Sequence, residues 1–146
     1  MQCVYNTKNI LSIDYSVFDY CEKLSSFNID DTVKYIGRNT FDNTGILSVY
    51  IPKEVTNIYT ETFCECKNLK NVIFNKNSKL AEIHKNAFYR CESLTYIKLP
   101  KNIKILHECA FNKCKNLKTI LIPKTIEVIK TNAFKCCENL QYVIFY

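Results

Sequence analysis

Tryptophan is absent from this chain, which also has only two glycines, three prolines and two arginines. The glycines, Gly37 and Gly45, are isolated, and this excludes the glycine-rich loops that hold phosphate groups. Because nucleic-acid interfaces usually carry arginine forks beside clustered aromatic side chains, the shortage of arginine argues against such an interface. No apolar run approaches the roughly 18–20 residues that a membrane-spanning helix needs. The sequence therefore disfavours nucleotide-binding, nucleic-acid-binding and membrane-inserted proteins.

Candidate catalytic groups are also scarce. The few serines include none on a recognisable nucleophile elbow, and the carboxylates do not recur as pairs at matching positions. The first ten residues lack the basic-then-apolar layout of a secretory signal. We predict that the protein is not an enzyme and uses no cofactor.

The net charge of +6 comes from 18 lysines, which together with 16 asparagines and 17 isoleucines indicate AT-rich coding. Lys53, Lys101 and Lys124 each follow a proline and should form a basic column along one edge of the fold. A solvated edge that keeps the protein soluble explains such a column more simply than a nucleic-acid contact does.

A repeat dominates what the chain does contain. Its marker residues recur at intervals of 23, 22, 25, 23 and 23 residues: Phe18, Phe41, Phe63, Phe88, Phe111 and Phe134. A period held this closely indicates one supersecondary unit repeated about six times, each unit too small to bury a core alone. The apolar content of 47% is enough for one continuous core.

Each repeat carries the same frame around its phenylalanine. An aliphatic residue lies five positions before it, a cysteine (Thr44 in one repeat) lies three positions after it, and a leucine follows three positions later. The next residues alternate, as in Ile97-Lys98-Leu99, which indicates a short strand with one buried face, and proline often ends it. The spacing before the leucine fits a turn of helix or 3₁₀ helix. We predict an α/β solenoid of about six rungs, with short parallel strands and short helical or 3₁₀ turns.

Two intervals depart from the period of 23. The longer one contains the polar segment 75–79 in place of the proline turn, and the shorter one reflects a residue lost between Leu47 and Val49. Insertions in repeat proteins map to loops, so the stacked columns should stay in place.

Residues 94–114 read LTYIKLPKNIKILHECAFNKC and resemble the BspA-like leucine-rich repeat family, whose units run roughly L-x-x-I-x-I-P-x-x-V-x-x-I-x-x-x-A-F-x-x-C. The resemblance covers about residue 10 to the C-terminus. Alanine precedes the phenylalanine only in the later repeats, so the N-terminal repeats are the more diverged ones. The resemblance implies a leucine-rich repeat fold, cell-surface adhesion or recognition, and a surface or secreted location. Because this chain shows neither a signal peptide nor a transmembrane segment, the compartment stays open.

We expect a single domain over residues 1–146. Residues 1–24 would form a diverged N-terminal cap and first repeat, and residues 25–146 would carry the other repeats and an uncapped C-terminal rung. The chain ends in a strand-like run, Tyr142-Val143-Ile144-Phe145-Tyr146, without a polar capping unit. This rung should pair with another copy or continue into a longer array.

Nine cysteines in a short chain invite a disulfide or metal interpretation, but five follow the repeat: Cys21, Cys66, Cys91, Cys114 and Cys137. A small apolar thiol packs well inside a rung, so we predict a reduced cysteine ladder. An odd total cannot pair fully within one chain, although neighbours in the column could lie within disulfide range. No C-x-x-C spacing of a zinc or thioredoxin-like site is present.

His84 and His107 are the only histidines, and both lie four residues before their phenylalanine. They should therefore stack on adjacent rungs, where together with Cys109 they could bind a soft divalent metal. The rungs next to them carry Tyr59 and Lys130 in this column, and Asp14 and Gly37 come earlier, so no carboxylate or third histidine completes the set. We expect an exposed polar pair and no metal site.

The strand frame also predicts which side chains point away from the core. The expected partner-binding residues are Tyr50, Ile73, Tyr96, Lys98, Leu121, Tyr142 and Ile144. So many apolar and aromatic side chains on one wet face exceed what isolated exposed hydrophobes would give. The sequence thus predicts a non-enzymatic module that binds a host or self protein through its sheet face. The alternative is an assembly element that forms a homodimer through its open C-terminal rung.

Overall fold

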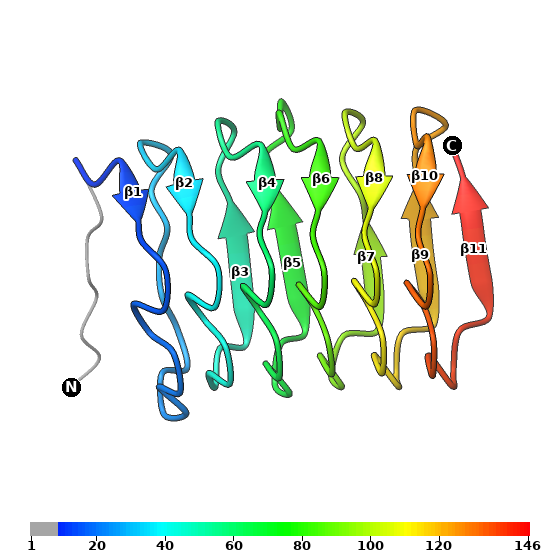
Figure 1. Cartoon of the computed structure of the whole chain (residues 1–146), viewed down its shortest axis with the longest axis horizontal. Helices are drawn as coiled ribbons and strands as arrows, with labels where there is room; N and C mark the ends of the chain where they lie inside the picture. The colour runs from blue at the N-terminus through cyan, green and yellow to red at the C-terminus, as the bar shows by residue number, and fades with distance from the viewer. Residues whose placement is uncertain (1–8) are drawn as a thin grey trace.

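The computed structural model describes residues 9–146, which wind into a solenoid of stacked rungs (Figure 1). Every strand pairing within these residues is parallel. The strands lie in two rows; every rung from residue 35 onward contributes one strand to each row, whereas the first rung contributes a strand to one row only. The rungs follow one another from the N-terminal to the C-terminal end of the molecule. The predicted solenoid with short parallel strands is confirmed.

One row contains the longer strands: β3 (Ser48–Ile51), β5 (Asn71–Phe74), β7 (Tyr96–Lys98), β9 (Thr119–Ile122) and β11 (Tyr142–Phe145). They form two sheets, β3-β5 and β7-β9-β11. The other row contains two-residue strands: β1 (Ser12–Ile13), β2 (Tyr35–Ile36), β4 (Asn57–Ile58), β6 (Glu82–Ile83), β8 (Ile105–Leu106) and β10 (Val128–Ile129). These pair as β1-β2 and as β4-β6-β8-β10.

The phenylalanines form a continuous stack through the core. Successive ring centroids lie 5.1–5.7 Å apart. The four inner rings, Phe41, Phe63, Phe88 and Phe111, are at most 1% exposed. Since each buried aromatic side chain stabilises a fold by roughly 1.5–3 kcal/mol, the stack is a main source of cohesion between rungs.

The segment around each phenylalanine is a turn, and no helix or 3₁₀ helix forms in residues 9–146, which departs from the expected helical turns. The residues two before and two after each phenylalanine have positive φ angles of 49–61°. Right-handed helices need negative φ at every position, so two left-handed residues in each rung prevent one. Backbone N–H groups donate to the next rung instead, as from Phe63 to the carbonyl of Ala87 at 2.9 Å.

Cysteines of the repeat column add hydrogen bonds between rungs. Sγ of Cys91 donates to the carbonyl oxygen of Phe63 at 3.2 Å, and Sγ of Cys114 donates to that of Phe88 at 3.1 Å. All the cysteines within the described part of the chain are free thiols. The same carbonyl oxygens of Phe63 and Phe88 also accept backbone hydrogen bonds from Cys66 and Cys91, so the thiol adds a second hydrogen bond to each buried carbonyl group.

The interval of 22 residues is shortened at Gly45, whereas we predicted a loss between Leu47 and Val49. Ile46 is 1% exposed and takes the place of the column leucine, while Leu47 is 48% exposed. The shorter path brings Gly45 so close to the preceding rung that a Cβ atom would lie 2.4 Å from the carbonyl oxygen of Glu22. Only glycine fits this approach.

The two ends of the solenoid differ from its middle. The predicted N-terminal cap falls partly on residues 1–8, outside the described residues. At the other end, Val143 and Phe145 are 45% and 52% exposed, although the matching Ile120 and Ile122 one rung earlier are fully buried. No helix within residues 9–146 has the length and apolar character needed to cross a bilayer.

Candidate functional site: the long-strand face and its groove

The predicted binding residues lie in register on the outer face of the long strands. Tyr50 pairs with Ile73 across β3 and β5. Lys98 pairs with Leu121, which in turn pairs with Ile144, across β7, β9 and β11. Because strand side chains alternate between faces, this register places all five on one face of the row.

Most of these side chains are open to solvent. Among the apolar and aromatic members, the exposed fractions are Tyr142 58%, Ile73 55%, Tyr96 49% and Ile144 46%. Lys98 is also exposed, whereas Tyr50 and Leu121 are half-buried. The face therefore presents a mixed aromatic and aliphatic surface with one cationic group.

A groove of about 710 Å³ divides this face between β5 and β7. These two strands are not hydrogen-bonded neighbours, although β3-β5 and β7-β9-β11 are each continuous. Val72 and Phe74 on β5 line one side, and Tyr96 and Lys98 on β7 line the other. Both β5 residues are half-buried, while their counterparts in the rungs on either side are buried. The groove thus gives a ligand access to apolar side chains that elsewhere belong to the core.

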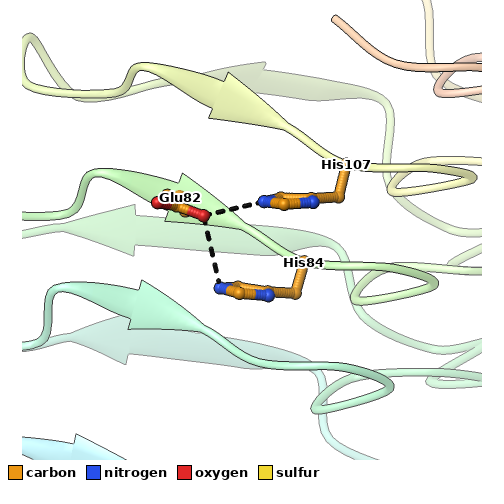
Figure 2. Close-up of side chains that lie close together, drawn as sticks. All are labelled: Glu82, His84 and His107. Atoms are coloured by element: carbon orange, nitrogen blue, oxygen red, sulfur yellow. Dashed lines mark hydrogen bonds and ion pairs between the residues drawn. The ribbon is translucent and has the colours of Figure 1, made fainter. Parts of the chain in front are cut away.

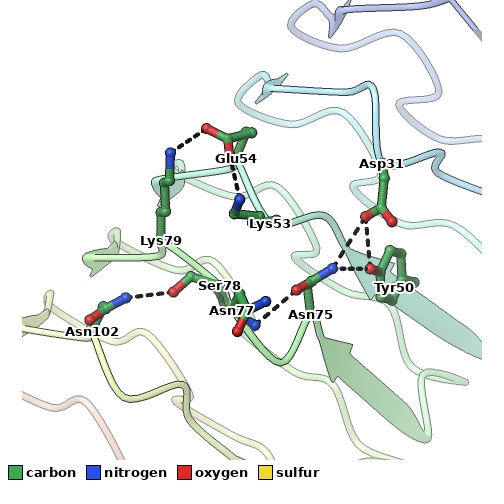
Figure 3. Close-up of polar contacts among 9 residues, drawn as sticks. All are labelled: Asp31, Tyr50, Lys53, Glu54, Asn75, Asn77, Ser78, Lys79 and Asn102. Carbon is green, nitrogen blue, oxygen red and sulfur yellow. Dashed lines mark hydrogen bonds and ion pairs between the residues drawn. The ribbon is translucent and has the colours of Figure 1, made fainter.

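The polar loop 75–79 borders one end of the groove and is held by hydrogen bonds to other rungs (Figure 3). The Asn75 side-chain amide donates to Tyr50 Oη at 2.7 Å, and that hydroxyl donates to Asp31 at 2.8 Å. Asn102 donates to the backbone carbonyl of Ser78 at 2.6 Å. Burial and the hydrogen bond to Asp31 raise the pKa of Tyr50, which therefore keeps its proton as a donor. The loop is accordingly a fixed rim.

Tyr146 forms another part of the rim. Its hydroxyl donates to the carbonyl oxygen of Leu99 at 2.7 Å, and the ammonium group of Lys98 lies 4.8 Å from the centre of its ring. Burial raises the pKa of Tyr146, and the neighbouring Tyr96 adds to this effect. A cation held over an aromatic face remains available to an acidic group on a ligand.

Sequence reasoning identified the exposed columns but not the groove. Alternation along the strand predicts that Val72 and Phe74 face the core, and Tyr146 stands at the position that Pro123 holds one rung earlier. The available signal was the two-residue insertion, because five residues (75–79) replace the three (52–54) of the preceding turn. The break between the sheets occurs at the rung that carries this insertion.

A second cluster lies on the row of short strands (Figure 2). The rings of His84 and His107 stack in parallel with centroids 4.6 Å apart, as their shared position predicted. Nε2 of His107 lies 2.7 Å from a carboxylate oxygen of Glu82, and Nε2 of His84 lies 3.6 Å from the same oxygen. Glu82 lies two residues before His84, in a neighbouring outward-facing column, so the residues of the histidine column alone do not include it. Burial lowers the pKa of His84, and the adjacent His107 lowers it further.

Cys109, the third ligand considered from sequence, is not part of this cluster. The donor atoms of Glu82, His84 and His107 all lie within 4.8 Å of one another, and this is the group in residues 9–146 that could hold a metal ion. Cys109 instead occupies a left-handed turn position with a φ of 58°.

Known proteins identify the type of repeat. A model of the BspA type leucine-rich repeat region matches the chain in six copies, over residues 2–82 and 35–146. A solved leucine-rich repeat protein of T. pallidum is 22% identical with a TM-score of 0.68, covering 92% of this chain and 51% of that one. A leucine-rich cell surface protein of Faecalibacterium prausnitzii is 19% identical with a TM-score of 0.60, covering 93% and 51%.

A leucine-rich repeat protein of Bacteroides ovatus is 22% identical with a TM-score of 0.59, covering 92% of this chain and 46% of that one. At these identities the likeness shows the fold alone. The chain spans about half the length of these three proteins. A search among curated proteins finds no match.

Proposed function

Because the chain belongs to the BspA-type leucine-rich repeat family, we propose that it recognises another protein through the outer face of its long strands, without catalysing a reaction. Leucine-rich repeat folds are typical of protein-binding and surface modules, and stacked repeats build extended binding surfaces. The observation that supports this proposal most directly is the exposed aromatic and aliphatic face beside a groove of about 710 Å³.

The composition of this face supports a protein partner. Interface hot spots are enriched in tyrosine and cluster around apolar anchors that a polar rim surrounds. Here Tyr96 and Ile73 flank an apolar groove, and Asn75 and Lys98 supply polar and cationic groups at its edge. A partner segment with an apolar anchor and an acidic neighbour fits this arrangement. Adhesion or recognition at a cell surface is the setting we propose, since one structural neighbour is a cell surface protein.

A capture experiment tests the face. The biotinylated chain would be incubated with host and self extracts, and each retained protein would be compared between wild type and the double variant Ile73→Lys, Tyr96→Lys. Both side chains are about half exposed, so the fold should persist. Loss of such anchors typically costs 2 kcal/mol or more, or roughly 30-fold in Kd.

The matched control is Tyr20→Lys, because Tyr20 is 68% exposed but lies on a turn, away from the long strands. Partners that wild type and the control retain but the double variant loses would support the outer face of the long strands as the binding surface. Equal retention by all three chains, with matching circular dichroism spectra, would refute it.

Self-association through β11 is a second candidate, favoured by its exposed apolar side chains. Val143, Ile144 and Phe145 are 45–52% exposed and lie on the outermost described strand of its sheet. An unpaired edge and an open core layer could be covered by a second copy of the chain. Sedimentation would show a dimer that Val143→Lys dissociates; a monomer at high concentration excludes this candidate.

A further inference from the structure

The cluster on the short strands is arranged like a set of metal ligands (Figure 2). Glu82, His84 and His107 come from β6 and from the positions just after β6 and β8, and both imidazole Nε2 atoms point toward the Glu82 carboxylate. The side chains of the two histidines are 27% and 17% exposed, so solvent ions can reach them.

The solenoid itself fixes the separation of the ligands. Parallel pairing of β6 with β8 holds the two rings on adjacent rungs, with an interplanar angle of 8°. All three donor atoms lie within 4.8 Å of one another. Donor atoms on one tetrahedral zinc ion lie roughly 3.3 Å apart, so the two rings would have to turn out of their parallel stack to bring both Nε2 atoms onto one ion.

The neighbouring side chains suit such a site. Tyr59 stacks on the other face of His84, with ring centroids 5.3 Å apart. On the far side, one carboxylate oxygen of Glu108 lies 3.9 Å from Nδ1 of His107, and the other oxygen pairs with Lys130 at 3.4 Å. A carboxylate beside the second nitrogen of a metal-binding histidine is a common outer partner, because it orients the ring.

We infer that Glu82, His84 and His107 form a binding site for a divalent transition-metal ion, with zinc as the best-suited ion. Two imidazoles and one carboxylate are a common zinc set, and hard ions such as magnesium prefer oxygen ligands alone. Three protein ligands leave one position for water. The site ties adjacent rungs together on the row opposite the proposed recognition face, so either inference can fail without the other.

Histidine NMR gives a direct test, since the chain has only two histidines. We expect one equivalent of zinc chloride to shift the ring signals of both, while magnesium chloride leaves them unchanged. Accessible thiols are the competing zinc ligands, so the titration is run on a chain carrying Cys21→Ser and Cys136→Ser, which remove the exposed thiols, and Cys109→Ser, which removes a partly exposed one. The same chain with exposed thiols blocked by iodoacetamide serves if that variant does not fold.

Two variants distinguish a specific metal site from nonspecific zinc binding. His84→Tyr copies Tyr59, which occupies the same position one rung earlier, so stacking should survive while a ligand is lost. Loss of an outer partner typically weakens metal binding by roughly 10- to 100-fold, and we expect a loss in this range for Glu108→Gln. His84→Tyr removes a ligand, so we expect it to weaken zinc binding by more than this.

Zinc should also raise the Tm of wild type but not that of His84→Tyr, because a ligand bound only by the native state stabilises it. Zinc binding that leaves both histidine signals in place, or that His84→Tyr does not weaken, would overturn the inference. So would unchanged histidine signals at millimolar zinc.

Discussion

At the scale of single residues, burial should decide which thiols react. Burial raises the pKa of Cys66 to about 11 and that of Cys137 to about 11, and it raises the pKa of the fully buried Cys91 well above its usual value. The thiolate is the nucleophile, so these groups should resist alkylation at mildly alkaline pH. Cys21 and Cys136 are exposed and should react first.

Iodoacetamide labelling of the native chain, mapped by mass spectrometry, checks this order. Labelling in denaturant supplies the control, since every thiol should then react. Rapid modification of Cys91 in the native chain would contradict the packed, reduced column, and an absence of labelling even in denaturant would indicate disulfides.

Asp42 gives a pH-dependent prediction. Burial raises the pKa of its carboxyl group, and the nearby charge of Asp19 adds to the rise, while a hydrogen bond from Asn39 opposes it. The native state therefore binds more protons than the unfolded state between the two pKa values. The stabilising contribution is complete below the unfolded-state pKa and is lost as the pH rises through the native-state pKa.

Asp42→Asn should accordingly raise the free energy of unfolding at neutral pH, and the gain should disappear near about pH 3. The Asn39 amide can still donate to the new side-chain oxygen. Urea unfolding of both chains across this range provides the measurement. A gain that stays constant with pH would show that charge is not its cause.

At the scale of the element, the phenylalanine stack should make the middle rungs more sensitive than the last one. Phe88 is fully buried between Phe63 and Phe111, while Phe134 is half-buried and stacks on one ring only within the described residues. Phe88→Ala should cost about 3–5 kcal/mol in the free energy of unfolding, and Phe134→Ala clearly less.

Urea denaturation monitored by circular dichroism measures both losses. Phe88→Leu keeps most of the volume and should recover much of the stability. Equal losses for the two alanine variants would mean that the stack does not act as a ladder of nearest-neighbour contacts.

The same element shows where sequence reasoning stopped. The period located the stack and the strands, because stacking places identical residue types in buried columns. It did not reveal the turns, since positive φ at residues such as Glu61 and Arg90 has no strong signal in residue type. Spacing alone suggested a helix there. Hydrogen bonding to the next rung is what favours the left-handed conformation.

At the scale of the whole molecule, the sites depend on contacts between columns, which a one-dimensional frame cannot show. The frame gave the exposed face around Tyr96 because alternation fixes the side of a strand. It missed the ligand set because Glu82 contacts His107 from the preceding rung and from a different column of the repeat. It missed the groove because the sequence of a single strand does not show whether that strand pairs with its neighbour.

The missing pairing between β5 and β7 should make that junction open first. Tyr96 and Lys98 on β7 match Thr119 and Leu121 on β9, but only β9 has a hydrogen-bonded strand on its N-terminal side. Backbone amides that point toward an unpaired neighbour exchange with solvent more readily than amides in a ladder. Hydrogen exchange followed by NMR should therefore be faster at Tyr96 and Lys98 than at their counterparts.

Removing two residues from loop 75–79 offers the converse test, because it restores the period of 23 on which the other rungs close. The shortened chain should pair β5 with β7, slow exchange at Tyr96 and Lys98, and reduce the access of ligands to Phe74. If exchange at these two positions already equals that of Thr119 and Leu121 in the natural chain, the junction is closed in solution. The groove would then be ruled out as part of the recognition face, and the exposed columns alone would have to account for binding.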